Sequence, residues 1–113
     1  MPDLFPAVPT HSTMLDERLP ALRARLLAQR QFRLDQLATL DAATEPHDEI
    51  DQALHDAARS VLADIETALG HIARGDYGRC QSCLTAEIPI EWLAVLPTAA
   101  LCPDCLQARA NAS

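Results

Sequence analysis

Two Cys-x-x-Cys pairs constrain this chain more than any other feature of its sequence. The first pair is Cys80 and Cys83, and the second is Cys102 and Cys105. Each pair can place two thiolates on the same side of a metal ion, and two such pairs complete the tetrahedral four-thiolate shell of structural zinc. The separation of the pairs, residues 84–101, lies in the range typical of such sites. The sequence therefore predicts one structural zinc ion held by all four cysteines.

Two other uses of four cysteines are weaker interpretations. Two disulfides would suit a secreted protein, but residues 1–9 contain Asp3, several prolines and no basic residue, which is unlike a signal peptide. A redox dithiol of the thioredoxin type belongs to a βαβ unit, and the sequence has no such alternation. Reduced cysteines and the lack of a targeting segment lead us to expect a cytoplasmic protein.

Composition narrows the class of partner. Hydrophobic residues make up 49% of the 113 residues but aromatic residues only 4%, so Ala and Leu dominate and helices are favoured. The net charge is −7, and every basic residue is Arg. A chain without a basic stripe is not expected to bind DNA or RNA directly, whereas a basic protein surface would attract it. No apolar run is long enough to span a membrane.

The periodicity of the sequence predicts a helical hairpin. Residues 1–12 are expected to form a disordered tail, and residues 13–75 two helices joined by a tip loop at 43–51. The first helix either follows a short turn or begins at Pro20, because proline is tolerated only in a first turn. Asp48 is expected to cap the second helix and Gly75 to end it. Apolar residues of the second helix recur at spacings of four and three: Ile50, Leu54, Ala57, Val61, Ile65, Ala68 and Ile72.

Two helices that are each apolar on one face and joined by a short loop should fold back on each other. We therefore expect an all-α fold, in which an antiparallel helical hairpin of coiled-coil type carries a four-cysteine zinc finger at its base. Residues 76–113 would form this finger and a short C-terminal helix. A hairpin of this kind has a thin core, so the zinc end is expected to anchor it.

Several motifs in this order resemble the DksA/TraR family of bacterial RNA polymerase-binding regulators. The resemblance covers roughly residues 21–105. It rests on Gly75-x-Tyr77-Gly78-x-Cys80-x-x-Cys83, on Glu87-Ile88-Pro89-Ile90, and on Leu96-Pro97-Thr98-Ala99-x-Leu101-Cys102-x-x-Cys105. At the tip, the family pattern Asp-x-x-Asp-x-Ala is matched by Asp48, Asp51 and Ala53.

The resemblance implies a non-enzymatic transcription regulator. Such proteins insert the hairpin into the secondary channel of RNA polymerase and bring the acidic tip to the active centre, without binding DNA. Asp48, Asp51 and Ala53 would then be the residues of the tip, and the protein would act as a monomer. The alternative from the residues alone is that Asp48 and Asp51 only cap the second helix. The alternative for the whole chain is a zinc-stapled helical interaction module with a partner other than polymerase.

The chain also departs from the family pattern. Leu84 stands where a glycine usually follows the first cysteine pair, with one residue inserted, so we expect the chain to take another path there. Some members bind the alarmone guanosine tetraphosphate through basic side chains, but the corresponding positions here are Asp64, Leu96 and Leu106. Alarmone binding is therefore not expected. Trp92, near the basic positions of other members, either packs on the finger or serves as an exposed anchor.

Overall fold

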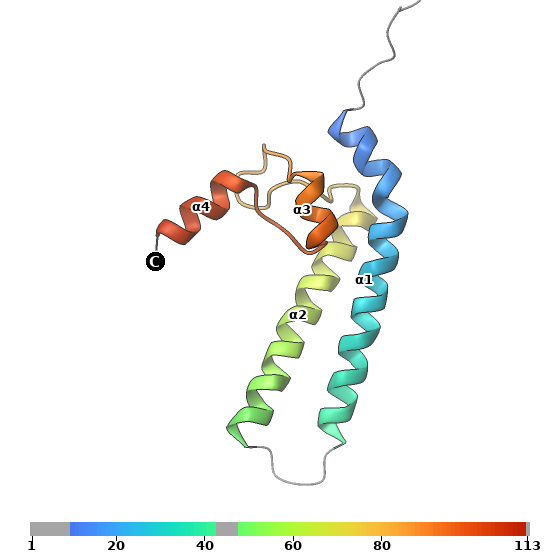
Figure 1. Ribbon diagram of the computed structural model, residues 1–113, viewed down its shortest axis with the longest axis vertical. Helices are drawn as coiled ribbons and strands as arrows, with labels where there is room; N and C mark the ends of the chain where they lie inside the picture. Colours follow the sequence, from blue (N-terminus) through green and yellow to red (C-terminus); the bar gives the residue numbers. More distant parts are fainter. Residues whose placement is uncertain (1–9, 43–47, 113) are drawn as a thin grey trace, which may run out of the picture.

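The computed structural model describes residues 10–42 and 48–112. These residues form four helices: α1 (His11–Asp41), α2 (Glu49–Arg74), α3 (Ile90–Val95) and α4 (Pro103–Asn111). Helices α1 and α2 lie side by side and antiparallel, and α3 and α4 lie beside the end of this hairpin at which α2 finishes (Figure 1). Within the described ranges there is no β-strand, only an isolated antiparallel bridge between Arg79 and Glu87. The all-α hairpin with a small cysteine module at its base is confirmed.

Helix α1 begins at His11, two residues before the expected boundary. Thr10 is its N-cap, and the Thr10 hydroxyl accepts a hydrogen bond of 3.1 Å from the backbone N–H of Thr13. His11 also has a tertiary contact, because its Nε2 donates to the carbonyl oxygen of Ile88 at 2.7 Å. Residues 11 and 12 therefore belong to the helix and not to a tail. The remainder of the expected tail, residues 1–9, lies outside the described residues.

Pro20 lies inside α1, which is continuous through it. Neither sequence-based alternative, a short turn before Pro20 or a helix start at Pro20, is found. Proline has no N–H, so the carbonyl of Asp16 receives no hydrogen bond from within the helix. Both residues are exposed, and water can bind that carbonyl instead.

Helix α2 has the termini that the sequence predicts. Asp48 is its N-cap, and Asp48 Oδ1 accepts a 2.8 Å hydrogen bond from the backbone N–H of Asp51. Gly75 ends the helix in the left-handed conformation, with φ of 82°, which glycine adopts without steric cost. Residues 43–47 of the expected tip loop lie outside the described residues, and residues 49–51 form the first turn of α2.

The hydrophobic core lies at the finger end of the hairpin. Its buried members come from α1, α2 and the finger (residues 76–112), and they are Leu15, Leu22, Leu26, Ile65, Ala68, Tyr77, Ile88 and Leu93. Beyond Leu26, no described residue of α1 is fully buried. The hairpin arm is therefore thin, and burial is concentrated where the finger packs against it. No described helix is both long and apolar enough to cross a membrane.

The apolar seam predicted along α2 is wrong at its far end. Ile50 is 71% exposed and Leu54 46% exposed, whereas His55 is turned toward α1 and its Nε2 lies 2.9 Å from Oδ1 of Asp41. The seam positions keep pace with the turn of a straight helix, so they stay on one face of α2. The helices are antiparallel and His55 faces Asp41, the last residue of α1, so Ile50 lies past the end of α1 and has no turn of that helix to pack against. Near the tip, the contact between the two helices is therefore polar.

Candidate metal centre and hairpin tip

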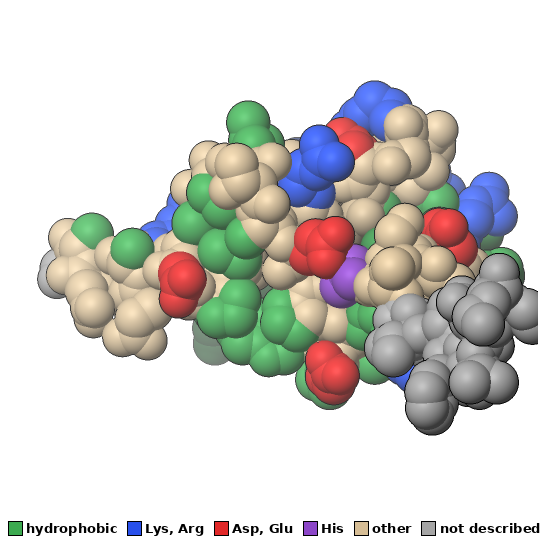
Figure 2. Space-filling model, turned by 90° about the horizontal axis from the view of Figure 1, so that it is seen from above, with side chains coloured by type: hydrophobic (Ala, Val, Ile, Leu, Met, Phe, Trp, Pro, Cys, Tyr) green, Lys and Arg blue, Asp and Glu red, His purple; other side chains and the backbone are tan. Residues whose placement is uncertain are grey.

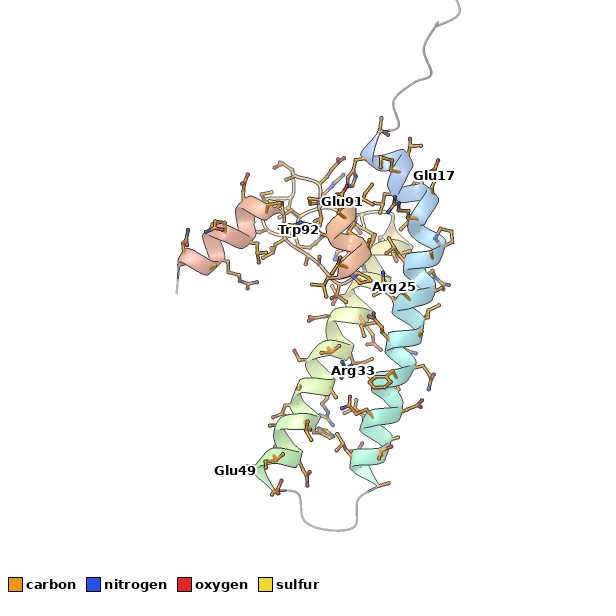
Figure 3. All side chains as sticks on the ribbon, viewed as in Figure 1. Glu17, Arg25, Arg33, Glu49, Glu91 and Trp92 are labelled. Atoms are coloured by element: carbon orange, nitrogen blue, oxygen red, sulfur yellow. The ribbon has the colours of Figure 1, made fainter. Side chains whose placement is uncertain are left out.

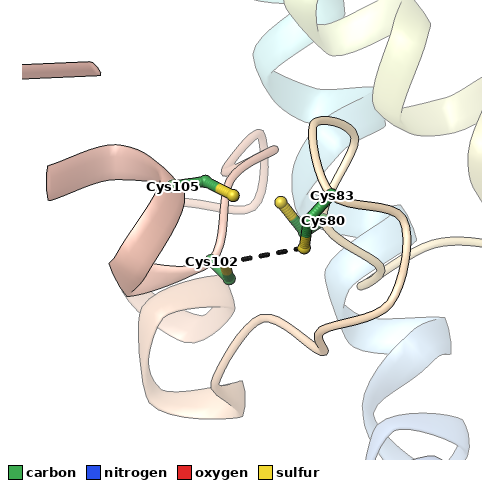
Figure 4. A group of neighbouring side chains, drawn as sticks. All are labelled: Cys80, Cys83, Cys102 and Cys105. Carbon is green, nitrogen blue, oxygen red and sulfur yellow. Dashed lines mark hydrogen bonds between the residues drawn. The ribbon is translucent and has the colours of Figure 1, made fainter. Parts of the chain in front are cut away.

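The four cysteines converge at the base of the hairpin. Their Sγ atoms all lie within 4.8 Å of one another, and Sγ of Cys83 and Sγ of Cys102 are 4.0 Å apart (Figure 4). A disulfide needs about 2.05 Å between sulfurs, so these are free thiols. A tetrahedron with metal–sulfur bonds of 2.3 Å has sulfur–sulfur edges of about 3.8 Å. The arrangement therefore fits four thiolates around one tetrahedral ion.

Backbone hydrogen bonds place the two cysteine pairs. In the first, the N–H of Cys80 bonds to the carbonyl of Ala86 at 2.9 Å, and the N–H of Leu84 returns to the carbonyl of Cys80 at 3.1 Å. In the second, Cys102 is the N-cap of α4, and the turn that begins there carries Cys105 back toward Cys102. The N–H of Gln81 bonds to the carbonyl of Ala100 at 2.8 Å, which joins the two segments.

Leu84 adopts a left-handed backbone conformation, with φ of 62°, and is the one non-glycine residue among the described residues to do so. The expectation that this turn would take another path is therefore wrong. The turn returns the chain to Cys80, and the hydrogen bonds between Leu84 and Cys80 and between Cys80 and Ala86 offset the cost of about 1–2 kcal/mol for a side chain in that conformation. The Leu84 side chain is exposed, so it meets no further steric penalty from packing.

The surroundings of the sulfurs lower the pKa of one cysteine thiol and raise that of another. The Thr85 side chain, followed by the backbone N–H groups of Thr85 and Ala86, lowers the pKa of Cys83 to about 6. The neighbouring sulfur of Cys102, followed by that of Cys80, raises the pKa of Cys105 to about 12. Four thiolates at these distances repel one another, and a divalent cation among them removes the repulsion. The donor set is therefore chemically suited to a soft divalent metal ion such as Zn²⁺.

The finger is held against the hairpin by contacts with α1 and by a hydrogen bond within the finger itself. The hydroxyl of Tyr77 donates to the carbonyl of Pro97 at 2.7 Å, and Arg25 of α1 donates to the carbonyl of Ala94 in α3. Gly78, with φ of 88°, is packed so closely on Leu15 that a Cβ there would lie 2.7 Å from Leu15 Cδ2. The position of the cysteine cluster relative to the hairpin is consequently set by packing as well as by the covalent connection of the finger to α2.

The residues expected at the tip lie at the opposite end of α2 from the cysteines (Figure 1). Asp48 and Ala53 are exposed, whereas Asp51 is half-buried. Glu49 adds a carboxylate beside them in the first turn of α2 (Figure 3). The capping role of Asp48 is thus confirmed, and it leaves the second carboxylate oxygen accessible to a partner. Helix α2, 26 residues long, holds the tip about 39 Å from the base.

Sequence analysis missed one surface on the finger, an apolar groove between α3 and α4. Its walls are Trp92 and Val95 of α3, Leu96 and Ala99 after it, and Leu106 of α4. Trp92 lies on the side of α3 that faces α4 (Figure 3). The signal available in the sequence was the apolar run from Trp92 to Leu96, which exceeds what one face of a short helix can bury.

Comparisons with known proteins agree with this architecture. No family model matches the sequence. The RNA polymerase-binding transcription factor DksA of Buchnera aphidicola subsp. Acyrthosiphon pisum (strain APS) is 39% identical over 67 residues, which are 58% of this chain and 44% of that protein. The chain thus matches less than half the length of this curated relative. The solved structure of transcription factor DksA2 from Pseudomonas aeruginosa aligns with a TM-score of 0.57 and 25% identity, covering 88% of this chain and 83% of that one.

The two matches are to proteins named DksA and DksA2. The motifs that carry the resemblance also lie where such a hairpin would place them. The cysteine pairs meet in one cluster, and the acidic motif stands at the free end of the hairpin. On these grounds the chain is similar to the DksA proteins in sequence and in fold.

Proposed function

We propose that this protein regulates transcription by binding RNA polymerase, inserting its hairpin into the secondary channel so that the tip acts at the active centre. The observation that carries the proposal is the separation of an acidic tip from a compact base by a thin helical arm. The Buchnera relative is named as an RNA polymerase-binding transcription factor, which supports the choice of partner. The base and the finger would rest at the channel entrance.

Charge supports the same direction of insertion. The tip half of α2 with its cap carries Asp48, Glu49, Asp51 and Asp56 against the single cation Arg59. A channel that admits nucleotides with their bound metal ions is expected to be electropositive, so it would draw this end inward. The same charge opposes direct binding to DNA, whose phosphates need cations. In this proposal the protein acts as a monomer and catalyses no reaction itself.

We further propose that Cys80, Cys83, Cys102 and Cys105 hold one structural zinc ion. The closed, four-sulfur geometry supports a structural role, because a catalytic zinc ion keeps one position open for water or substrate. Zinc would fasten the loop after α2 to the start of α4 and so keep the finger in place at the base of the arm.

The proposal does not include the alarmone. Leu96 and Leu106, at two of the positions where some family members carry cations, line an apolar groove, and Asp64 at the third would repel phosphate. The effect on a responsive promoter should therefore be unchanged by guanosine tetraphosphate when the polymerase lacks its other alarmone site. Synergy of several-fold that disappears in Arg59→Ala or Arg74→Ala would contradict this part of the proposal.

The proposal as a whole is tested by mixing the purified protein with core RNA polymerase and with promoter DNA separately. Stoichiometric binding to polymerase and none to DNA at moderate salt is expected. Binding to DNA alone, or none to core polymerase at micromolar concentrations of both proteins, would contradict it.

A further inference from the structure

The apolar groove between α3 and α4 gathers four of the exposed large hydrophobic residues of the finger. Val95 is 82% exposed, Leu96 56%, Leu106 47% and Trp92 37%. These side chains come from two helices and the loop between them, and they border a shallow, open hollow of about 350 Å³. Exposed apolar residues scattered singly need no explanation, but a contiguous set around a hollow marks an interaction surface. An aromatic residue beside such a hollow is a frequent centre of binding energy.

Acidic residues of the finger are the charged residues nearest the groove. Glu91 lines it, Asp104 lies in the first turn of α4, and no basic residue occurs between Arg79 and Arg109. Arg25 of α1 reaches α3, but its guanidinium is bound to the carbonyl of Ala94. Arg109 contributes to a different hollow, which it shares with Ser82 and Cys105. If the metal proposed above is present, four thiolates and one divalent ion leave two further negative charges nearby. Figure 2, a view onto the finger end, shows hydrophobic side chains gathered next to α4, with acidic side chains, and arginine side chains as well, around them.

We propose that this groove binds an apolar side chain of a partner protein that is flanked there by Arg or Lys. Burial of the apolar side chains that line the groove would supply the affinity. Glu91 and Asp104, which form an acidic frame around the groove, would select a partner with basic residues. The same frame disfavours a second copy of this chain, because pairing two grooves would bring Glu91 of both copies together. It equally disfavours nucleic acid and anionic lipid. That the partner is RNA polymerase, gripped outside the channel, rests on the proposed function.

Trp92 provides a direct readout, because it is the only tryptophan in the chain. The probe is a synthetic helical peptide with leucines on one face and arginines beside them. Matched peptides replace the arginines by glutamates, or the leucines by serines. We expect a saturable change in Trp92 fluorescence with the Leu/Arg peptide, and binding at least about tenfold weaker for both matched peptides. The double variant Val95→Gln/Leu106→Gln should lose the response, and Leu84→Gln, an exposed leucine of the finger outside the groove, should keep it.

Three results would overturn the inference. They are no response to the Leu/Arg peptide, an equal response to the Leu/Glu peptide, and a concentration-dependent dimer of the native chain that Val95→Gln/Leu106→Gln abolishes. The last result would assign the groove to a second copy.

A parallel measurement of affinity for core polymerase separates this inference from the proposed function. The double variant should bind at least about tenfold more weakly than the native chain, and Leu84→Gln equally well. Peptide binding without any polymerase binding would leave the groove assigned and the proposed function wrong. Unchanged polymerase affinity of the double variant would remove polymerase as the groove's partner.

Discussion

The hydroxyl of Tyr77 donates a 2.7 Å hydrogen bond to the carbonyl of Pro97, and both residues are buried where the finger meets the hairpin. Burial raises the pKa of Tyr77 from its ordinary value of 10.0 to about 12. The neutral form is thus favoured in the folded protein. Stability should be unaffected by this group below about pH 10 and should fall as the pH rises from 10 toward 12, by at most about 2 kcal/mol.

Tyr77 is the only tyrosine, so the absorbance of tyrosinate reports this one group. The native protein should titrate near pH 12, and the denatured protein near pH 10. Tyr77→Phe should lower stability at neutral pH by about 1–2 kcal/mol, because the carbonyl of Pro97 loses its donor. Tyr77→Phe should also remove the part of the fall in stability between pH 10 and pH 12 that comes from ionisation of this tyrosine. A native titration near pH 10 would show that Tyr77 is not held in the buried contact.

The left-handed backbone of Leu84 predicts a stabilising substitution. Leu84→Gly should raise the free energy of unfolding of the metal-loaded protein by about 1 kcal/mol, since glycine adopts this conformation without steric cost. Leu84→Val should lower it, because a β-branched residue fits this conformation least well. Urea denaturation of the three proteins provides the comparison. Equal stability of Leu84→Gly and Leu84→Val would mean that residue 84 does not adopt a positive φ.

The cysteine cluster predicts one zinc ion per chain in protein purified under reducing conditions. Cys105→Ser should lose that metal, whereas Ser82→Ala, between the first two cysteines, should keep it. Chelation should expose the core residues Ile88 and Leu93 and lower the melting temperature, because metal binding is coupled to folding of the finger. Elemental analysis and thermal unfolding measure the two effects. A chain that contains no stoichiometric zinc, or one whose unfolding ignores chelation, contradicts the assignment.

At the tip, Asp48→Asn together with Asp51→Asn should abolish the effect on transcription while polymerase affinity stays within about threefold. Asparagine caps a helix nearly as well as aspartate, so this pair removes charge without removing the cap. Glu49→Gln, in the same turn, is the control for loss of charge alone. Parallel loss of affinity and activity would indicate that the tip is an anchor. Full activity of the double variant would mean that these carboxylates serve only the helix.

Sequence reasoning succeeded where local chemistry decides the structure. The cap at Asp48, the stop at Gly75 and the convergence of the cysteine pairs all follow from residue type and spacing. It failed where tertiary contacts decide. His11 is helical and is held in place by the finger, and the predicted seam includes Ile50, which is exposed because α1 ends before reaching it.

The left-handed turn at Leu84 and the position of the groove beside Trp92 could not be derived from the sequence, although exposure of Trp92 was one of the alternatives. The first depends on backbone hydrogen bonds that offset the steric cost of a positive φ, and no local rule compares these two energies. The second depends on how α3 and α4 are placed around the cysteine cluster, which spacing alone does not specify.

The most direct test of the central claim places a photo-activated cross-linker at Gln52, exposed in the second turn of α2, in complex with core RNA polymerase. A second cross-linker at Gln107 in α4 marks the finger. The account predicts that position 52 cross-links to polymerase segments lining the active centre, and position 107 to the outer surface near the secondary channel. Cross-links from position 52 to the outer surface alone, in a complex that forms with full affinity, would contradict insertion of the hairpin.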